Sequence, residues 1–329
     1  MGLIDWAKQF HRRTQTRPFT SAVYQSGWEL VNGILHRTIA DRIGTSVWSK
    51  DWDILVVLDA TRVDTFREVS QEFDWIDTEA ITSYWSVGSY SGSWVANTFD
   101  VTDHPEAKST AYISGNDWAQ REVSWEPNLP IDDSQLPLFV PAADFCWEEV
   151  GGVETVNPHL LTDLAITAWR NRTQYGFDKM IVHYMQPHQP FIGHPDLIHQ
   201  MDIEGEDDYE GRENFGVWDS AYKGTVTRQE ILEAYQNNLR YALGCIDTLR
   251  TNVDANIAIT ADHGNALGEL RQWGHPAGSL LSSVRKVPWT VIEGEDRMSR
   301  EVDIDVSNLS SDKNTDTNVK SRLQQLGYL

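Results

Sequence analysis

A carboxylate and an imidazole stand side by side in the last third of the chain. Residues 257–261 (IAITA) form a short apolar run that leads directly into Asp262, His263 and Gly264, and His275 follows after a polar segment. Such a run, bounded by glycine, is typical of a buried parallel strand. Asp and His side chains at its end are ligand types for Zn²⁺ or Mn²⁺. The alternative is a loop aspartate that caps a helix beside an exposed histidine.

Two other predicted strands end in comparable residues. Residues 54–58 (ILVVL) lead into Asp59, and residues 179–185 (KMIVHYM) lead toward His188, which stands between two prolines. In an open α/β sheet the carboxyl ends of parallel strands meet at one edge, where ligands bind. We therefore expect Asp59 and His188 to approach the pair at 262 and 263. Asp59 could instead cap the helix that follows it.

A serine-rich loop supplies candidate nucleophiles. Residues 87–94 (VGSYSGSW) precede a predicted short helix, and Ser91 stands where the N-cap of that helix would be, with Ser89 two residues earlier. A hydroxyl beside a divalent cation has a lowered pKa and attacks esters at neutral pH. A capping role for Ser91 is the competing interpretation.

Cationic side chains near these positions would bind a tetrahedral anion. His188, His275 and Arg62 could donate charge-assisted hydrogen bonds to phosphate or sulfate oxygens. Arg62 could equally form a local ion pair with Asp64. His183 lies within a strand instead of at its end, so we expect it to be a core residue.

Predicted strands alternate with helices along the chain, which indicates an α/β fold with a mostly parallel sheet sandwiched by helices. We expect an N-terminal helical segment (1–50), a catalytic domain (51–300) that contains an acidic insertion and candidate lid (193–224), and a C-terminal tail and helix (301–329). Within the domain, residues 117–145 should be irregular. Pro288 indicates that the strand at 287–292 lies at a sheet edge.

Composition limits the partners. The 329 residues carry a net charge of −22, with 8 Lys and 19 Arg among 27 basic residues, which disfavours nucleic acid and suits a halophilic source. The two cysteines indicate no disulfide framework. No secretory signal precedes the first helix and no apolar run is long enough to span a membrane, so we expect a cytoplasmic protein. The amphipathic N-terminal segment leaves peripheral membrane contact open.

Four motifs resemble, in order, those of the alkaline phosphatase superfamily and more narrowly its sulfatase-like branch, which includes phosphoglycerol transferases. They are residues 58–64 (LDATRVD), 186–191 (QPHQPF), 262–264 (DHG) and 274–276 (GHP), within a stretch from about 53 to 292. The resemblance implies an alkaline-phosphatase-like fold. It also implies a hydrolase or transferase that acts on a phosphate or sulfate ester, on a glycan or lipid, through a covalent seryl intermediate.

The resemblance assigns roles to the candidate residues. Asp59, Asp262 and His263 match the ligands of one divalent metal (Mn, Zn, Mg or Ca), joined by the oxygen of Ser91, with Ser89 as the second choice. His188 matches a histidine that contacts the anion or the leaving group, and His275 matches a later histidine that binds the anion or a second metal.

Two departures from the family pattern narrow the chemistry and the number of metals that we expect. Neither Ser89 nor Ser91 begins the C/S-x-P-x-R motif of formylglycine sulfatases, so we do not expect that route. Two-metal members have Asp-x-x-x-His where this chain has Gln186 before Pro187 and His188, so we expect one metal. The alternative function is a catalytically silent relative that binds an anionic glycan or lipid head group.

Overall fold

The structure of the chain is a computed structural model. It describes residues 3–16, 18–38, 43–123, 126, 128–197, 216–302 and 304–309. The centre of the acidic insertion, residues 198–215, and the predicted final helix at 318–326 lie outside the described residues.

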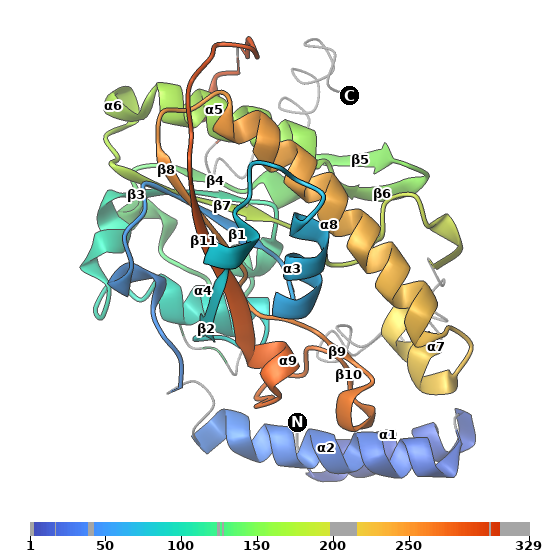
Figure 1. Cartoon of the computed structure of the whole chain (residues 1–329). Coiled ribbons are helices and arrows are strands. Elements are labelled where there is room, and N and C mark those ends of the chain that lie inside the picture. Colours follow the sequence, from blue (N-terminus) through green and yellow to red (C-terminus); the bar gives the residue numbers. More distant parts are fainter. Residues whose placement is uncertain are drawn as a thin grey trace.

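A seven-stranded sheet forms the centre of the molecule, in the order β2-β11-β8-β1-β7-β3-β4 (Figure 1). Neighbouring strands are parallel from β8 to β4, whereas β11 runs antiparallel to both β8 and β2. The expected mostly parallel α/β sheet is therefore confirmed. Its strands are β1 (Ile54–Leu58), β2 (Thr82–Trp85), β3 (Thr110–Ser114), β4 (Phe139–Val140), β7 (Lys179–Tyr184), β8 (Asn256–Thr260) and β11 (Lys286–Glu293).

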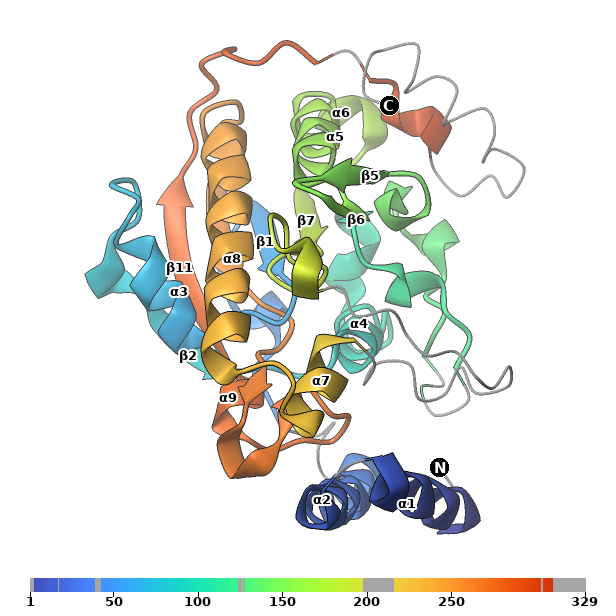
Figure 2. The same ribbon diagram turned by 90° about the vertical axis from the view of Figure 1, so that its right-hand side faces the viewer.

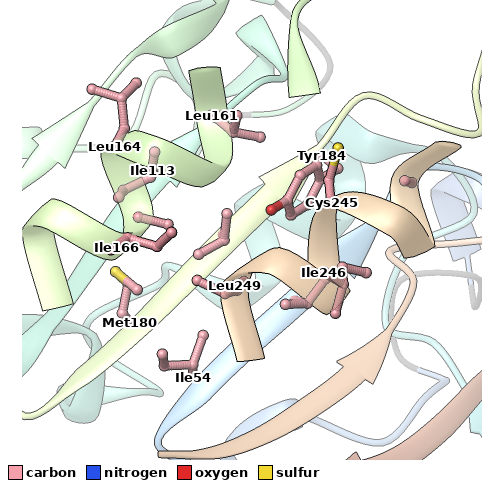
Figure 3. Close-up of a cluster of buried hydrophobic side chains, with 14 of the residues drawn as sticks. Ile54, Ile113, Leu161, Leu164, Ile166, Met180, Tyr184, Cys245, Ile246 and Leu249 are labelled. Carbon is pink, nitrogen blue, oxygen red and sulfur yellow. The ribbon is translucent and has the colours of Figure 1, made fainter. Parts of the chain in front are cut away.

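Apolar residues cover both faces of the central strands, because each face of the sheet is packed under other elements. Every residue of β1 is buried, and successive side chains enter opposite clusters: Ile54, Val56 and Leu58 one, Leu55 and Val57 the other. The first cluster packs β1, β3 and β7 against two long helices (Figure 3). A continuous apolar run is the pattern expected of a parallel strand buried on both faces.

Helices lie on both faces of this sheet (Figures 1 and 2). The first cluster contains buried residues of α3 (Val63–Ser70), α5 (Pro158–Arg170) and α8 (Arg228–Arg250). The second contains Trp94, Val95 and Ala96 of α4 (Ser91–Thr98), on the opposite face. Short elements complete the described fold: α6 (Arg172–Tyr175), α7 (Val217–Lys223), α9 (Ser282–Arg285), and the hairpins β5 (Trp147–Val150) with β6 (Val153–Val156) and β9 (Ala266–Leu267) with β10 (Trp273–Gly274).

The N-terminal helices α1 (Leu3–Thr16) and α2 (Phe19–Thr38) form an antiparallel hairpin at one end of the molecule, next to α9, β9 and β10 (Figures 1 and 2). Arg13 of α1 forms an ion pair with Glu29 of α2 at 2.5 Å, and Trp6 Nε1 donates to the Ser26 carbonyl at 2.8 Å. No helix in the described part of the chain combines the length and apolarity needed to cross a bilayer.

One expectation about the sheet is wrong. The strand that contains Pro288 lies inside the sheet, between β2 and β8, and not at an edge. Residues 286–289 pair only with β2 and residues 290–293 pair only with β8. Pro288 therefore lies beyond the β8 ladder, where its missing N–H interrupts no bond to that central strand.

A buried tyrosine ties α8 to the turn after β1. The Tyr235 hydroxyl donates to the Ala60 carbonyl at 2.5 Å and accepts from the Arg62 N–H at 2.9 Å. All three residues are buried. The hydroxyl therefore satisfies two backbone groups in a turn that belongs to no regular element.

We predict that Tyr235→Phe lowers the free energy of unfolding by about 1–3 kcal/mol, because it leaves both backbone groups buried without this partner. Tyr241→Phe on the same helix is the matched control and should change stability by less than about 0.5 kcal/mol. Denaturant unfolding of both variants checks the prediction, and equal losses would contradict it.

Candidate active site

Asp59 lies at the carboxyl end of β1 and is buried. The next residue, Ala60, has φ +63°, a conformation uncommon for a residue with a side chain and costly enough to be rare outside functional turns. This conformation directs the Ala60 N–H to Asp262 Oδ1 at 3.0 Å. The turn after β1 is thereby bonded to the turn after β8.

Asp262 and His263 follow β8, the strand beside β1. His263 Nε2 lies 3.3 Å from Asp262 Oδ2 and 3.6 Å from Asp59 Oδ1. The Nδ1 of His263 donates to the Gly264 carbonyl at 2.9 Å, which leaves the Nε2 lone pair directed at the two carboxylates. The structure thus brings together the three side chains expected to meet from distant parts of the sequence.

Ser91 and Ser89 have different surroundings. Ser91 Oγ lies 3.2 Å from His263 Nε2, whereas Ser89 Oγ accepts a hydrogen bond from the Gly278 N–H at 2.8 Å. Ser91 is the first residue of α4 and not its N-cap, which is Tyr90. The Ser93 hydroxyl accepts from the N–H of this N-cap at 3.5 Å, as in a capping box, so capping does not use Ser91. Only Ser91 faces the Asp and His cluster.

His183 also belongs to this cluster, a position that the expectation of a plain core residue did not include. Its Nε2 lies 3.5 Å from Asp262 Oδ2, and both residues are fully buried. Its Nδ1 lies 3.0 Å from the Tyr112 hydroxyl, which accepts from Ser114 Oγ at 3.0 Å. The position of His183 one residue before the end of β7, on the face that α4 covers, was the available signal.

Asn116 is a second residue that the sequence interpretation did not select. Its Nδ2 donates to Asp59 Oδ2 at 2.8 Å, and its Oδ1 accepts from the Trp118 N–H at 3.0 Å. It follows β3, a further strand whose carboxyl end lies at this edge. Asn116 therefore fixes the orientation of the Asp59 carboxylate.

The electrostatics of the cluster favour a cation. Burial alone would raise the pKa of Asp262, but His263, His183 and the Ala60 N–H hold it below its ordinary value, so the carboxylate is ionised at neutral pH. Burial lowers the pKa of His263, which favours the neutral imidazole. A buried negative charge faced by the lone pair of the neutral His263 ring is costly without a compensating ion.

The residues present fit a divalent metal. Asp59, His183 and Asp262 each offer a ligand atom, and these atoms lie within 4.8 Å of one another. The Nε2 nitrogens of His183 and His263 lie 3.5 and 3.3 Å from Asp262 Oδ2. His263 Nε2 and Ser91 Oγ adjoin the same carboxylates. Carboxylate and imidazole ligands suit Zn²⁺ or Mn²⁺.

His188 and His275 extend the cluster into a row of imidazoles. The His263 and His275 ring centroids are 4.4 Å apart, and those of His275 and His188 are 5.2 Å apart. The Nδ1 of His188 donates to the Gln189 carbonyl at 2.7 Å, and that of His275 faces Asn265 Oδ1 at 2.8 Å. Burial lowers the pKa of His188 to about 4 and that of His275 well below its ordinary value, so both are neutral at pH 7.

Arg62 is held by other partners. Its guanidinium donates to both Asp64 carboxylate oxygens at 2.9 and 2.6 Å, to Glu269 at 2.8 Å and to the Asn265 carbonyl at 2.7 Å. Four of its five N–H groups are used in this way. The alternative ion pair with Asp64 is therefore present, and Arg62 links the turn after β1 to the segment around β9.

No known family model matches the chain, and no curated protein matches it in sequence. Solved structures resemble it. The soluble domain of lipooligosaccharide phosphoethanolamine transferase A from Neisseria meningitidis shares 16% identity at a TM-score of 0.44, with 78% of this chain and 79% of that one covered.

Two further structures resemble the chain. The C-terminal periplasmic domain of EcEptC from Escherichia coli, in complex with Zn, shares 12% identity at a TM-score of 0.40, with 77% and 76% of the chains covered. A protein in the alkaline phosphatase superfamily from Vibrio parahaemolyticus shares 12% identity at 0.37, with 77% and 62% covered. The last of these is described by the superfamily whose motifs the chain resembles, but at TM-scores below 0.5 the likeness carries no argument about activity.

We predict that the metal-free protein loses stability as the pH falls from 6.5 toward 4. In this interval His188 is protonated in the unfolded chain, with a pKa of 6.5, but not in the folded chain, where the pKa is about 4. The folded state binds fewer protons, so acid favours unfolding. Because His188 is only partly buried, solvent screening limits its share to about 1 kcal/mol at pH 5.

The contribution of His188 is measured by comparing thermal unfolding of the metal-free parent and of the metal-free His188→Gln variant between pH 7 and pH 5. The variant should show a shallower loss of melting temperature. Parallel curves would contradict the assignment of a neutral His188.

Proposed function

We propose that this chain is a metal-dependent hydrolase or transferase of phosphate or sulfate esters, with Ser91 as the nucleophile. The observation that supports the proposal most directly is the approach of Ser91 Oγ to His263 Nε2 at 3.2 Å, beside the carboxylates of Asp59 and Asp262. The choice of phosphate or sulfate, on a glycan or lipid, follows the resemblance of the motifs.

When bound, a divalent cation at Asp59, Asp262 and His263 would supply Lewis acidity that lowers the pKa of a neighbouring hydroxyl and neutralises an ester anion. Ser91 begins α4, so its Oγ lies at the positive end of the helix dipole, where N–H groups point outward. A tetrahedral anion placed there would have its phosphorus or sulfur atom in reach of the seryl oxygen.

In the first half-reaction the Ser91 Oγ bond to phosphorus or sulfur forms as the ester bond to the leaving alcohol breaks. We assign the proton of Ser91 to His188 Nε2, since the Nδ1 of that ring is already a donor. The imidazolium then protonates the leaving alcohol oxygen. In the second half-reaction water or an acceptor hydroxyl gives its proton to the same nitrogen and takes the group from Ser91, and the imidazolium then returns a proton to Ser91 Oγ.

His183 offers one of the possible ligand atoms, but the resemblance assigns the metal to His263, so we propose that His183 is a positioning residue. Its ring is held between the Tyr112 hydroxyl and Asp262 Oδ2, at 3.0 and 3.5 Å. Burial raises the pKa of Tyr112, so the phenol remains protonated and available for hydrogen bonding at neutral pH. Partners of this kind orient metal ligands, and their loss weakens metal binding.

We predict that Ser91→Ala lowers turnover of aryl phosphate or aryl sulfate by about a thousandfold or more, since removal of a nucleophile has an effect of this order. Ser89→Ala is the matched control and should lower turnover by less than about tenfold, because the Ser89 hydroxyl bonds the Gly278 N–H and not the Asp and His cluster. Intact-protein mass spectrometry during turnover should show a phosphoryl or sulfuryl adduct in the parent chain alone.

Equal activity of Ser91→Ala and the parent would overturn the choice of nucleophile. A protein that binds metal and anions but turns over neither ester would instead support the catalytically silent alternative.

We predict that His183→Leu weakens metal binding by about 10- to 100-fold, because Asp262 loses a buried partner. His159→Leu, on α5 and outside the cluster, should leave the affinity unchanged. Equilibrium dialysis of chelator-stripped protein against Zn²⁺ or Mn²⁺ gives the affinities. Equal affinities for parent and His183→Leu would contradict the positioning role.

A further inference from the structure

The outward side of α2 is apolar and exposed. Among the side chains of this helix that the structure describes, a set that excludes Arg37, ten are at exposed positions and none of these is charged: Phe19, Thr20, Val23, Tyr24, Gly27, Leu30, Val31, Gly33, Ile34 and Thr38. The six large apolar side chains among them are between 41% and 67% exposed. At about 100° per residue these six cover about 140° of the helix circumference, and we call them the outer face of α2.

The inward side of α2 is fixed to the rest of the protein. Trp28 Nε1 donates to the Leu270 carbonyl at 3.0 Å, and Asn32 Nδ2 donates to Gln272 Oε1 at 3.1 Å in a buried contact. Ser21 Oγ donates to the Tyr222 carbonyl at 3.2 Å. The helix therefore cannot turn its apolar side inward without breaking these bonds. Exposed apolar patches of this kind mark interaction sites.

The charge of the hairpin is opposite to that of the remaining chain. Residues 1–50 contain seven Lys and Arg against three Asp and Glu, whereas residues 51–329 contain 20 against 46. On α1, Lys8, His11 and Arg12 are exposed. An anionic surface attracts the hairpin and repels the acidic body, which selects one orientation of approach. A second copy of the chain would instead bring two acidic bodies together.

We propose that the α1–α2 hairpin docks this chain on an anionic lipid surface, with the outer face of α2 in the head-group region. An amphipathic helix with an uncharged apolar side and neighbouring basic residues binds membranes in this way, through buried apolar area and attraction to anionic lipids. The proposal does not depend on catalysis by Ser91, since it concerns binding alone.

Docking would place the candidate active site close to the lipid. The carboxyl ends of β8 and its parallel neighbours point toward the end of the molecule where the hairpin lies (Figure 1). His36 of α2 lies 3.8 Å from Glu126, which accepts a hydrogen bond from Tyr90, the residue before Ser91. If the proposed activity holds, esters on lipid head groups are the substrates this position would favour.

Vesicle co-sedimentation of the full chain tests the proposal. We expect binding to mixed phosphatidylcholine and phosphatidylglycerol vesicles, weaker binding to phosphatidylcholine alone, and loss of this preference in molar salt, where charges are screened. The double variant Val23→Glu, Ile34→Glu should weaken binding by about tenfold or more. Lys8→Glu should weaken binding to the anionic vesicles by about fivefold or more.

The matched control is Val291→Glu, which changes an equally exposed apolar residue, 47% exposed, on β11. It should bind vesicles like the parent, and circular dichroism should show all variants folded. Failure of the parent to sediment with anionic vesicles, or undiminished binding by the double variant, would overturn the proposal. If the parent is a dimer that does not bind vesicles, and the double variant is a monomer, the proposal is overturned and the outer face of α2 is a self-association surface.

Discussion

The structure depends on a buried negative charge at the carboxyl edge of a parallel sheet. Asp59 and Asp262 follow adjacent strands, and the turns that carry them are joined by the hydrogen bond from Ala60 to Asp262. Removing carboxylates from water is costly unless opposite charge or hydrogen bonds compensate. Asn116 and the backbone amides of Ala60 and His263 provide part of that compensation. A divalent cation bound by the same atoms, as we propose, would provide the rest.

Much of this arrangement could be predicted from the sequence, because short apolar runs that end in Asp or His identify both the strands and their functional ends. β1 has the predicted bounds. β7 ends one residue earlier than predicted, and β8 begins and ends one residue earlier than predicted. The convergence of positions 59, 262 and 263 follows from parallel topology. Which serine faces the cluster depends on the backbone path through Tyr90, and residue types alone do not specify that path.

Other features could not be predicted because they depend on tertiary pairing. β4 has only two residues, and its place in the sheet comes from pairing with β3, within a segment whose composition favours irregular structure. Pro288 was an unreliable sign of an edge, because one strand can change partners at its middle. His183 is buried within β7 as expected of a core residue, but the face of the sheet that it occupies, which places it beside Asp262, was not considered. Burial of an imidazole with both nitrogens near polar partners becomes evident only in three dimensions.

Gly278 has a consequence for how the sequence of this protein can change. Its φ is +77°, and a Cβ there would lie 2.3 Å from the Asn32 carbonyl and 2.5 Å from the His36 Cβ. Its N–H also bonds Ser89 in the serine-rich loop. Any larger residue would have to displace the helical hairpin and strain its own backbone at the same time. A side chain at position 278 would thus push α2 away from the serine-rich loop. We therefore expect this position to be among the least tolerant of substitution in the chain.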